Sequence, residues 1–146
     1  MKIFSLNIPG NHTLEYSILI VAAVLLLALF VTFAINLKAK TNYDKRWNEI
    51  QQLLSNKESW KKALIEADRL LDSALKKRHF KGKTMGERLV AAQHEIKFND
   101  MVWFSHKLTN KVANEGIKLN KTDLKKALLG FWKALKDLGV FIKEDE

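Results

Sequence analysis

The sequence predicts an all-α protein in which one N-terminal transmembrane helix precedes a compact bundle of about five helices. The chain of 146 residues contains only one Pro and six Gly, which excludes collagen-like, proline-rich and turn-dense all-β architectures. A long uncharged apolar run lies near the N-terminus, and beyond it apolar residues recur three or four positions apart, the period of an amphipathic helix. The absence of Cys excludes disulfide frameworks, thiolate zinc sites and Cys nucleophiles.

The apolar run covers residues 16–37 and carries no charged side chain. At the rise of an α-helix it spans roughly 33 Å, which is enough for the ~30 Å hydrocarbon core of a bilayer. Its apolar residues surround the helix axis instead of forming one stripe, which argues against an amphipathic helix lying on a membrane surface. We therefore expect an uncleaved transmembrane anchor, with the lipid bilayer as a partner.

Two processed forms are the alternatives to this anchor. A cleaved signal peptide has a basic start and an apolar core of about 7 to 15 residues, whereas a single Lys2 precedes this longer run. Gly10, followed five positions later by Glu15 and then by the apolar run, resembles the processing signal of type IV prepilins. That resemblance implies a pilin-like envelope subunit cut after Gly10, with Asn11 as its mature N-terminus.

Basic residues beside the apolar run predict its orientation. Only Lys2 precedes the run, whereas four basic residues follow it closely: Lys38, Lys40, Lys45 and Arg46. The positive-inside bias places a short N-terminal segment, residues 1–15, outside and residues 38–146 in the cytoplasm. We therefore expect a single-pass protein of the cytoplasmic (inner) membrane, whose net charge of +9 belongs to the cytoplasmic domain.

The domain is predicted to begin as a continuation of the anchor. Residues 43–54 carry Trp47 and Ile50 at helical spacing, and Ser55 with Glu58 three residues later forms a capping box that restarts the chain. The helix that follows has the clearest apolar stripe, made of Trp60, Ala63, Leu64, Ala67, Leu70, Leu71, Ala74 and Leu75. A stripe of this width predicts a core face. A basic stretch with Gly82, suited to a C-cap or turn, ends this helix.

Three more helices complete the predicted bundle. Thr84 with Glu87 is a second capping box, a fourth helix covers residues 99–114, and a fifth opens at Asn120 and stops at Gly139. The residues expected to face the core are Met85, Leu89, Ala92 and Ile96, then Met101, Phe104, Leu108 and Val112, then Leu124, Leu128, Phe131, Leu135 and Leu138. Short connections between these helices indicate antiparallel packing in one compact unit.

The sequence contains no recognisable enzyme motif. It lacks a glycine-rich phosphate loop and a pair of His residues at metal-binding spacing, so we expect no catalytic residue, no metal, no cofactor and no small-molecule substrate. Five polar residues of the bundle form a candidate cluster: Asp68, Asp72, Arg88, His106 and Asn110. We expect these residues to hold the helices in register through polar contacts, and a ligand site is the alternative.

A basic run is the candidate site for an anionic ligand. Its members are Lys76, Lys77, Arg78, Lys81 and Lys83, with Phe80 among them. Because an anchored domain lies beside a negatively charged leaflet, contact with anionic lipid is one explanation, and a solvated surface is another. Contact with the phosphates of RNA or DNA is the third, and it would be tolerant of sequence and sensitive to salt.

Residues 103–115 resemble the helix that carries the Arg-Asn and His motif of HEPN-type helical domains. In those domains an Arg and a His about five positions later act together in metal-independent RNA cleavage. Asn110 matches the motif, whereas Thr109 stands at the position of the Arg and Asn114 at the position of the His. Thr and Asn supply neither a fixed positive charge nor a titratable group, so the resemblance implies the fold and RNA binding more than cleavage.

The wider pattern, residues 66–72, 84–89 and 103–115, also resembles a group of small membrane-anchored bacterial proteins without an assigned function. That resemblance implies a cytoplasmic helical module on one anchor. Trp132 lies beside the apolar stripe of the last helix, and an exposed Trp favours a protein partner or self-association. We therefore expect a membrane-anchored, non-catalytic interaction or scaffold module, with a HEPN-like RNA-binding or ribonuclease domain and a pilin-like subunit as the alternatives.

Overall fold

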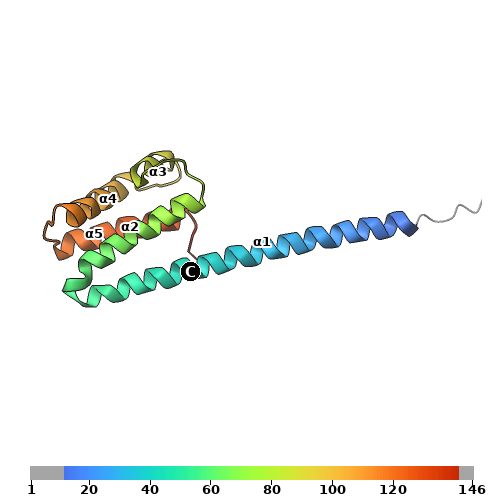
Figure 1. Ribbon diagram of the computed structural model, residues 1–146, viewed down its shortest axis with the longest axis horizontal. Helices are drawn as coiled ribbons and strands as arrows, with labels where there is room; N and C mark the ends of the chain where they lie inside the picture. Colours follow the sequence, from blue (N-terminus) through green and yellow to red (C-terminus); the bar gives the residue numbers. More distant parts are fainter. Residues whose placement is uncertain (1–11, 142–146) are drawn as a thin grey trace, which may run out of the picture. The chain divides into compact units, whose positions relative to one another are not determined.

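The computed structural model describes residues 12–141, with side chains from residue 16 onward, and this part of the chain is all-helical and contains no strand. Its α-helices are α1 (His12–Gln52), α2 (Trp60–Lys77), α3 (Met85–Ala91), α4 (Asn99–Asn114) and α5 (Lys121–Asp137) (Figure 1). Two short 3-10 turns, Leu53–Ser55 and Lys57–Ser59, connect α1 to α2. The expected processing position after Gly10 lies outside the described residues, as does most of the segment 1–15.

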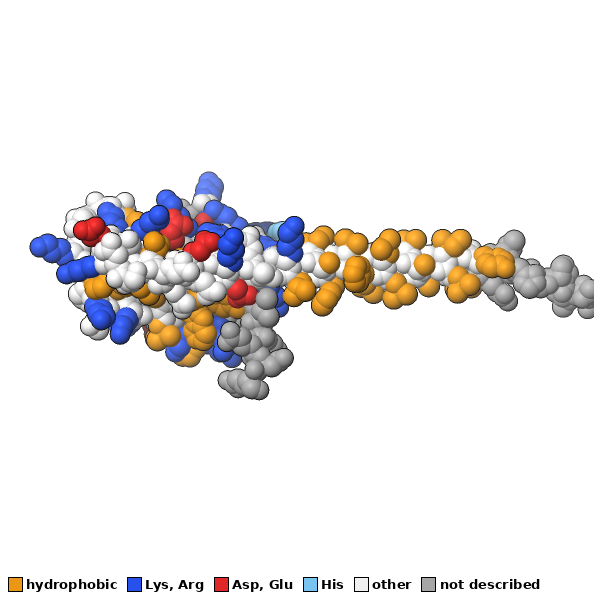
Figure 2. All heavy atoms as spheres, turned by 90° about the horizontal axis from the view of Figure 1, so that it is seen from below, with side chains coloured by type: hydrophobic (Ala, Val, Ile, Leu, Met, Phe, Trp, Pro, Cys, Tyr) orange, Lys and Arg blue, Asp and Glu red, His pale blue; other side chains and the backbone are white. Residues whose placement is uncertain are grey.

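The chain divides into two compact units, Met1–Leu37 and Lys38–Glu146. In the first unit every side chain of residues 16–37 is exposed, and Figure 2 shows apolar side chains along this segment. Within the described part of the chain, α1 is the one helix long and apolar enough to cross a membrane. The predicted apolar N-terminal helix is therefore confirmed.

The last turns of α1 belong to the second unit. The helix runs without a break to Gln52, as predicted, and buries Tyr43, Trp47 and Ile50 in the core. α2 packs against α3, α4 and α5, and it buries the whole predicted stripe except the half-buried Trp60: Ala63, Leu64, Ala67, Leu70, Leu71, Ala74 and Leu75. The predicted core face of α2 is confirmed, and together with the end of α1 it organises a bundle of five helices.

α3 and α5 begin at the predicted caps. The Thr84 hydroxyl accepts a hydrogen bond from the backbone N–H of Glu87 at 3.2 Å, and the Asn120 side chain accepts one from Asp123 N–H at 2.8 Å. Both caps satisfy a backbone donor that the first turn of a helix leaves unpaired. All predicted core positions of the two segments are buried: Met85, Leu89, Ala92 and Ile96, and Leu124, Leu128, Phe131, Leu135 and Leu138.

The predicted cap at Ser55 is wrong by one residue. The side chain of Asn56 accepts from the N–H of Glu58 at 3.0 Å, whereas the Ser55 hydroxyl donates to the carbonyl of Gln52 at 2.9 Å. An N-cap residue needs an extended backbone, and Asn56 has φ −113° and ψ 125°. Ser55 is still the last residue of the preceding 3-10 turn, so its hydroxyl bonds backward along the chain.

α4 has the predicted bounds, but its predicted inward face is wrong for three of four residues. Val112 is buried as expected, whereas Met101, Phe104 and Leu108 are only half-buried. The residues that face the core are Val102, Ser105, Thr109 and Val112. The helix is therefore rotated by about one position from the orientation that its largest apolar residues predict.

Hydrogen bonds and close packing explain this rotation. The hydroxyl of Ser105 donates to the carbonyl of Met101 at 2.7 Å and lies 2.9 Å from the carbonyl of Ala127, and Thr109 donates to the carbonyl of Ser105 at 2.9 Å. These bonds remove most of the cost of burying a hydroxyl. Gly130 of α5 faces Ser105 without a Cβ, so α4 and α5 approach closely along this small-residue seam.

Candidate functional site

The basic run begins in the last turn of α2 and continues into the loop before α3. α2 ends because His79 adopts a left-handed backbone, φ 62°, and the N–H of Phe80 then bonds to the carbonyl of Leu75 at 3.1 Å. This is the geometry of a Schellman cap, with His in the place that Gly usually takes. All five members of the run, Lys76, Lys77, Arg78, Lys81 and Lys83, are exposed.

Three members of the basic run have partners within the bundle. Lys76 Nζ lies 2.7 Å from a carboxylate oxygen of Asp72, and Arg78 forms an ion pair with Glu95. Lys77 places its ammonium 5.7 Å from the centre of the Tyr43 ring. The side chains of Lys81 and Lys83 form no ion pair with any described residue, so they are the positive charges most available to a ligand.

The contact with Tyr43 places the basic run at one particular end of the second unit. The hydroxyl of Ser73, one turn before Lys77, also lies 3.5 Å from the Tyr43 hydroxyl. Tyr43 follows Leu37 by six residues of continuous helix, or about 9 Å along its axis. The basic run therefore lies beside the first turns of α1 within the second unit.

The five residues of the polar cluster separate into two groups along α2. In the first, Arg88 donates through Nε at 2.8 Å and Nη2 at 2.5 Å to one carboxylate oxygen of Asp72, and through Nη1 to the carbonyl of Gly82 at 2.7 Å. Arg88 is 6% exposed, so this pair is largely removed from water. It fastens α3 and the loop after α2 to the side of α2.

The charge of Asp72 is stabilised in the folded state. Burial alone would raise the pKa of this carboxyl, but hydrogen bonds from Lys76 and Arg88, together with the positive charges of both, outweigh burial and lower the pKa below its ordinary value of 3.8. Gly82 closes the loop beside it at φ 153°, where an added Cβ would lie 2.7 Å from the Cβ of Glu87. These contacts of Asp72 and Arg88 agree with the expectation that the polar cluster holds the helices in register.

The second group joins α2 to α4. His106 Nδ1 lies 2.8 Å from a carboxylate oxygen of Asp68, and the amide nitrogen of Asn110 lies 3.3 Å from His106 Nε2. The imidazole also meets the edge of the Trp103 ring at 6.2 Å between centroids. A carboxylate that holds one ring nitrogen fixes the orientation of an imidazole, which is an arrangement that acid–base chemistry uses.

The positions singled out by the HEPN resemblance have different environments. Thr109 is buried between α4 and α5 with its hydroxyl bonded to the backbone. Asn110 contacts His106 on the other side of α4, and Asn114 is exposed in the last turn of the same helix. Thr109 therefore serves the packing of the core, whereas His106, Asn110 and Asn114 follow one line along the surface of α4 at intervals of four residues.

Sequence reasoning missed a group of lysines and aromatic rings on α4 and α5. Four aromatic side chains there each have a lysine ammonium near the ring: Phe98, Trp103, Phe104 and Trp132. The exposed side of α5 is basic in the sequence, so part of this surface was detectable from helical spacing. Lys107 with Trp103 and Lys136 with Trp132 are four residues apart on one helix, so these pairs were also detectable. Lys126 with Phe104 and Lys133 with Phe98 join different segments, so these pairs depend on packing and were not detectable.

The fold and these surfaces define a helical-bundle protein with an apolar N-terminal helix, a basic end and two polar groups that tie helices together. No group of three or more His, Asp or Glu residues that could hold a metal ion occurs among the described residues. No family model, curated protein or solved structure matches the chain.

Proposed function

We propose that this chain is a single-pass protein of the cytoplasmic membrane whose helical bundle is a non-catalytic interaction or scaffold module held against the inner leaflet. The observation that carries this proposal is the contact between Lys77 and Tyr43, because it puts the basic run beside the first turns of α1 within the second unit. The fully exposed apolar surface of residues 16–37 supports the membrane anchor.

Anionic lipid headgroups are the ligand that we propose for the basic run. Tyr43, which Lys77 contacts, lies about 9 Å along α1 from Leu37, a distance comparable to the Debye length of about 8 Å at physiological salt. Each basic residue close to an anionic leaflet contributes about 1 kcal/mol. Lys81 and Lys83 have no ion pair within the described residues to give up on contact with lipid.

The polar cluster supports a scaffold more than a catalyst. Arg88 and Asp72 satisfy each other and the loop carbonyl of Gly82, and Asp68 holds His106 against α2. These bonds connect α2 to α3 and α4, which is the role of polar groups that fix a unique arrangement of helices. The bundle then serves as a rigid body that presents its remaining surfaces to a partner.

Topology is tested by single-cysteine labelling, since the chain contains no Cys. Ser5→Cys and Ser59→Cys are made separately and treated in intact cells with a membrane-impermeant thiol reagent. The proposal predicts labelling at position 5 and none at position 59, with label appearing at 59 once the cells are opened. Labelling at position 59 in intact cells contradicts the proposal.

The intact mass of the purified chain distinguishes this protein from a pilin-like form that starts at Asn11.

A HEPN-like RNA-binding or ribonuclease domain is the second candidate. It is favoured by the contacts among Asp68, His106 and Asn110. Asp68 holds the imidazole of His106, which lies on α4, the helix whose sequence resembles the motif helix of HEPN-type domains. This candidate predicts that the full chain in phosphatidylcholine nanodiscs binds or cleaves single-stranded RNA, and that His106→Ala removes cleavage. Intact RNA with no measurable binding at low salt contradicts this second candidate and leaves the first standing.

A further inference from the structure

The exposed side of α4 and α5 carries a repeated arrangement that the basic run does not explain. Four ammonium groups lie over or beside aromatic rings: Lys133 on Phe98 at 3.9 Å, Lys126 on Phe104 at 4.4 Å, Lys136 on Trp132 at 5.1 Å and Lys107 on Trp103 at 6.0 Å, each measured to the ring centre. We call the two pairs that join α5 to the segment around the start of α4, Lys133 with Phe98 and Lys126 with Phe104, the lysine–aromatic face. Lysines held on rings keep their charges next to apolar surface instead of extending into water.

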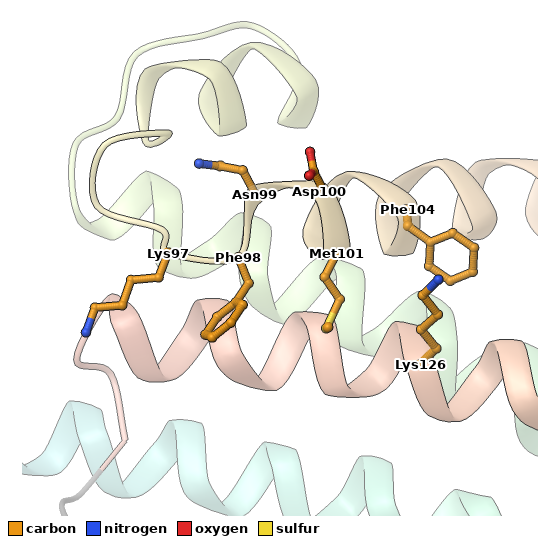
Figure 3. Close-up of a pocket in the computed structure, with 7 residues that line it drawn as sticks. All are labelled: Lys97, Phe98, Asn99, Asp100, Met101, Phe104 and Lys126. Carbon is orange, nitrogen blue, oxygen red and sulfur yellow. The ribbon is translucent and has the colours of Figure 1, made fainter.

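A cleft opens within this face between α4 and α5. It has a volume of about 410 Å³ and is lined by Phe98, Met101, Phe104 and Lys126, with the residues at the start of α4 along its other side (Figure 3). Figure 3 shows the side chains of Phe98 and Met101 pointing from the start of α4 toward α5, and Lys126 rising from α5 beside the Phe104 ring. Phe98 is 44% exposed, so part of its side chain is open to a ligand.

Lysines outnumber acidic residues in the segment that forms the cleft. Residues 97–137 contain nine lysines, no arginine and four acidic residues. One acidic residue, Asp100, lines the cleft, and Asp137 accepts a hydrogen bond from the backbone N–H of Lys97 at 2.9 Å at its edge, so the excess of lysines remains after both are counted. An apolar floor under lysine ammoniums is complementary to an apolar side chain with carboxylates beside it.

We propose that the lysine–aromatic face binds a protein segment in which acidic residues flank an apolar side chain. The apolar side chain covers Phe98 and Met101, and its neighbouring carboxylates meet Lys126 and Lys133. The contacts with the rings already restrict these two lysines, so less conformational entropy is lost on binding. Single-stranded RNA fits less well, since base stacking requires an open ring face, and ammonium groups cover Phe98 and Phe104.

The lysine–aromatic face is separate from the basic run. Its binding to a peptide can be measured without anionic lipid. The full chain is placed in nanodiscs of phosphatidylcholine alone, so that no anionic headgroup competes. Three fluorescein-labelled probes are titrated by anisotropy: a peptide of Glu and Leu, a peptide of the same length of Glu and Ser, and a uridine oligonucleotide. We expect the Glu and Leu peptide to bind at least about tenfold more tightly than the Glu and Ser peptide.

Matched variants assign the binding to this surface. Lys126→Glu with Lys133→Glu is compared with Lys61→Glu and Lys62→Glu, which make the same charge change at two exposed positions of α2. The first pair should weaken binding of the Glu and Leu peptide at least about tenfold and the second less than about twofold. Phe98→Ala, at an exposed position that the fold does not need, should remove the preference for Leu over Ser.

Four results overturn the proposal. They are no binding of the Glu and Leu peptide, equal binding of the two peptides, equal weakening by both pairs of variants, and tighter binding of the oligonucleotide that is lost with Lys126→Glu and Lys133→Glu. The last result would identify the face as a nucleic-acid site. A peptide preference that Phe98→Ala erases and the α2 pair leaves intact establishes the site.

Discussion

Lys77 lies with its ammonium 5.7 Å from the centre of the Tyr43 ring, although the two residues belong to different helices and are far apart in sequence. The contact joins the last turn of α2 to the first turns that α1 makes within the second unit. The contact therefore brings a basic run from the middle of the sequence next to the start of the second unit.

Arg88→Met is expected to lower the free energy of unfolding of the bundle by about 2 to 3 kcal/mol. The substitution leaves the half-buried carboxylate of Asp72 with Lys76 as its remaining cationic partner and the carbonyl of Gly82 without the Arg88 donor. Urea unfolding followed by Trp fluorescence in micelles measures the change. Arg69→Met is the control, since Arg69 pairs with Glu66 on the surface, and it should change stability by less than about 0.5 kcal/mol. A loss no larger than that of the control would show that the Arg88 pair does not hold the loop.

Asp72 predicts how the stability of the bundle depends on pH. Its folded-state pKa lies below 3.8, so its contribution is complete above the unfolded pKa and is lost as pH falls through the folded pKa. Asp72→Asn should therefore destabilise the bundle at neutral pH and flatten the fall in stability below about pH 4. Unfolding curves measured between neutral pH and pH 3 test this, with Glu66→Gln, at a half-buried position of α2, as the control. An unchanged acid dependence in Asp72→Asn would mean that other carboxyls dominate it.

Gly130→Ala is expected to destabilise the bundle by about 1 to 3 kcal/mol. The added Cβ would overlap the hydroxyl of Ser105 and lie 2.9 Å from the carbonyl of Met101. Gly86→Ala is the matched control, because its Cβ would meet the Trp103 ring at an ordinary 3.6 Å and Ala favours a helix. Thermal unfolding should show a lower Tm for Gly130→Ala and an equal or higher Tm for Gly86→Ala. Equal effects of the two would mean that the α4–α5 seam is not tightly packed.

The sequence predicted helix bounds better than helix faces. The spacing of apolar residues and the caps at Thr84 and Asn120 located α3, α4 and α5, because these signals are local. The face of α4 could not be predicted in the same way. Ser105 and Thr109 read as polar in the sequence, and only the carbonyls of neighbouring turns and of α5 show that their hydroxyls are satisfied in the core.

In the candidate sites, too, the local signals were predictable from the sequence and the features that depend on packing were not. The basic run was predicted from composition, but its place beside Tyr43 depends on how α2 packs against α1. The polar cluster was predicted as a set of contacts, and the structure resolves it into an Asp72 group and an Asp68 group one turn apart on α2. The lysine–aromatic face was missed because its rings and its ammoniums come from different segments.

Contact between the basic run and anionic lipid is measured most directly with an environment-sensitive fluorophore on a single Cys. Lys81→Cys carries the label in the basic run, and Ser55→Cys carries it just beyond the far end of α1, about 27 Å along the chain axis from residue 37. The full chain is placed in nanodiscs of phosphatidylcholine with and without phosphatidylserine. We predict a blue shift at position 81 only when phosphatidylserine is present, reversed by high salt, and no shift at position 55. Emission at position 81 that is the same in both lipids, or an equal shift at both positions, would contradict the account.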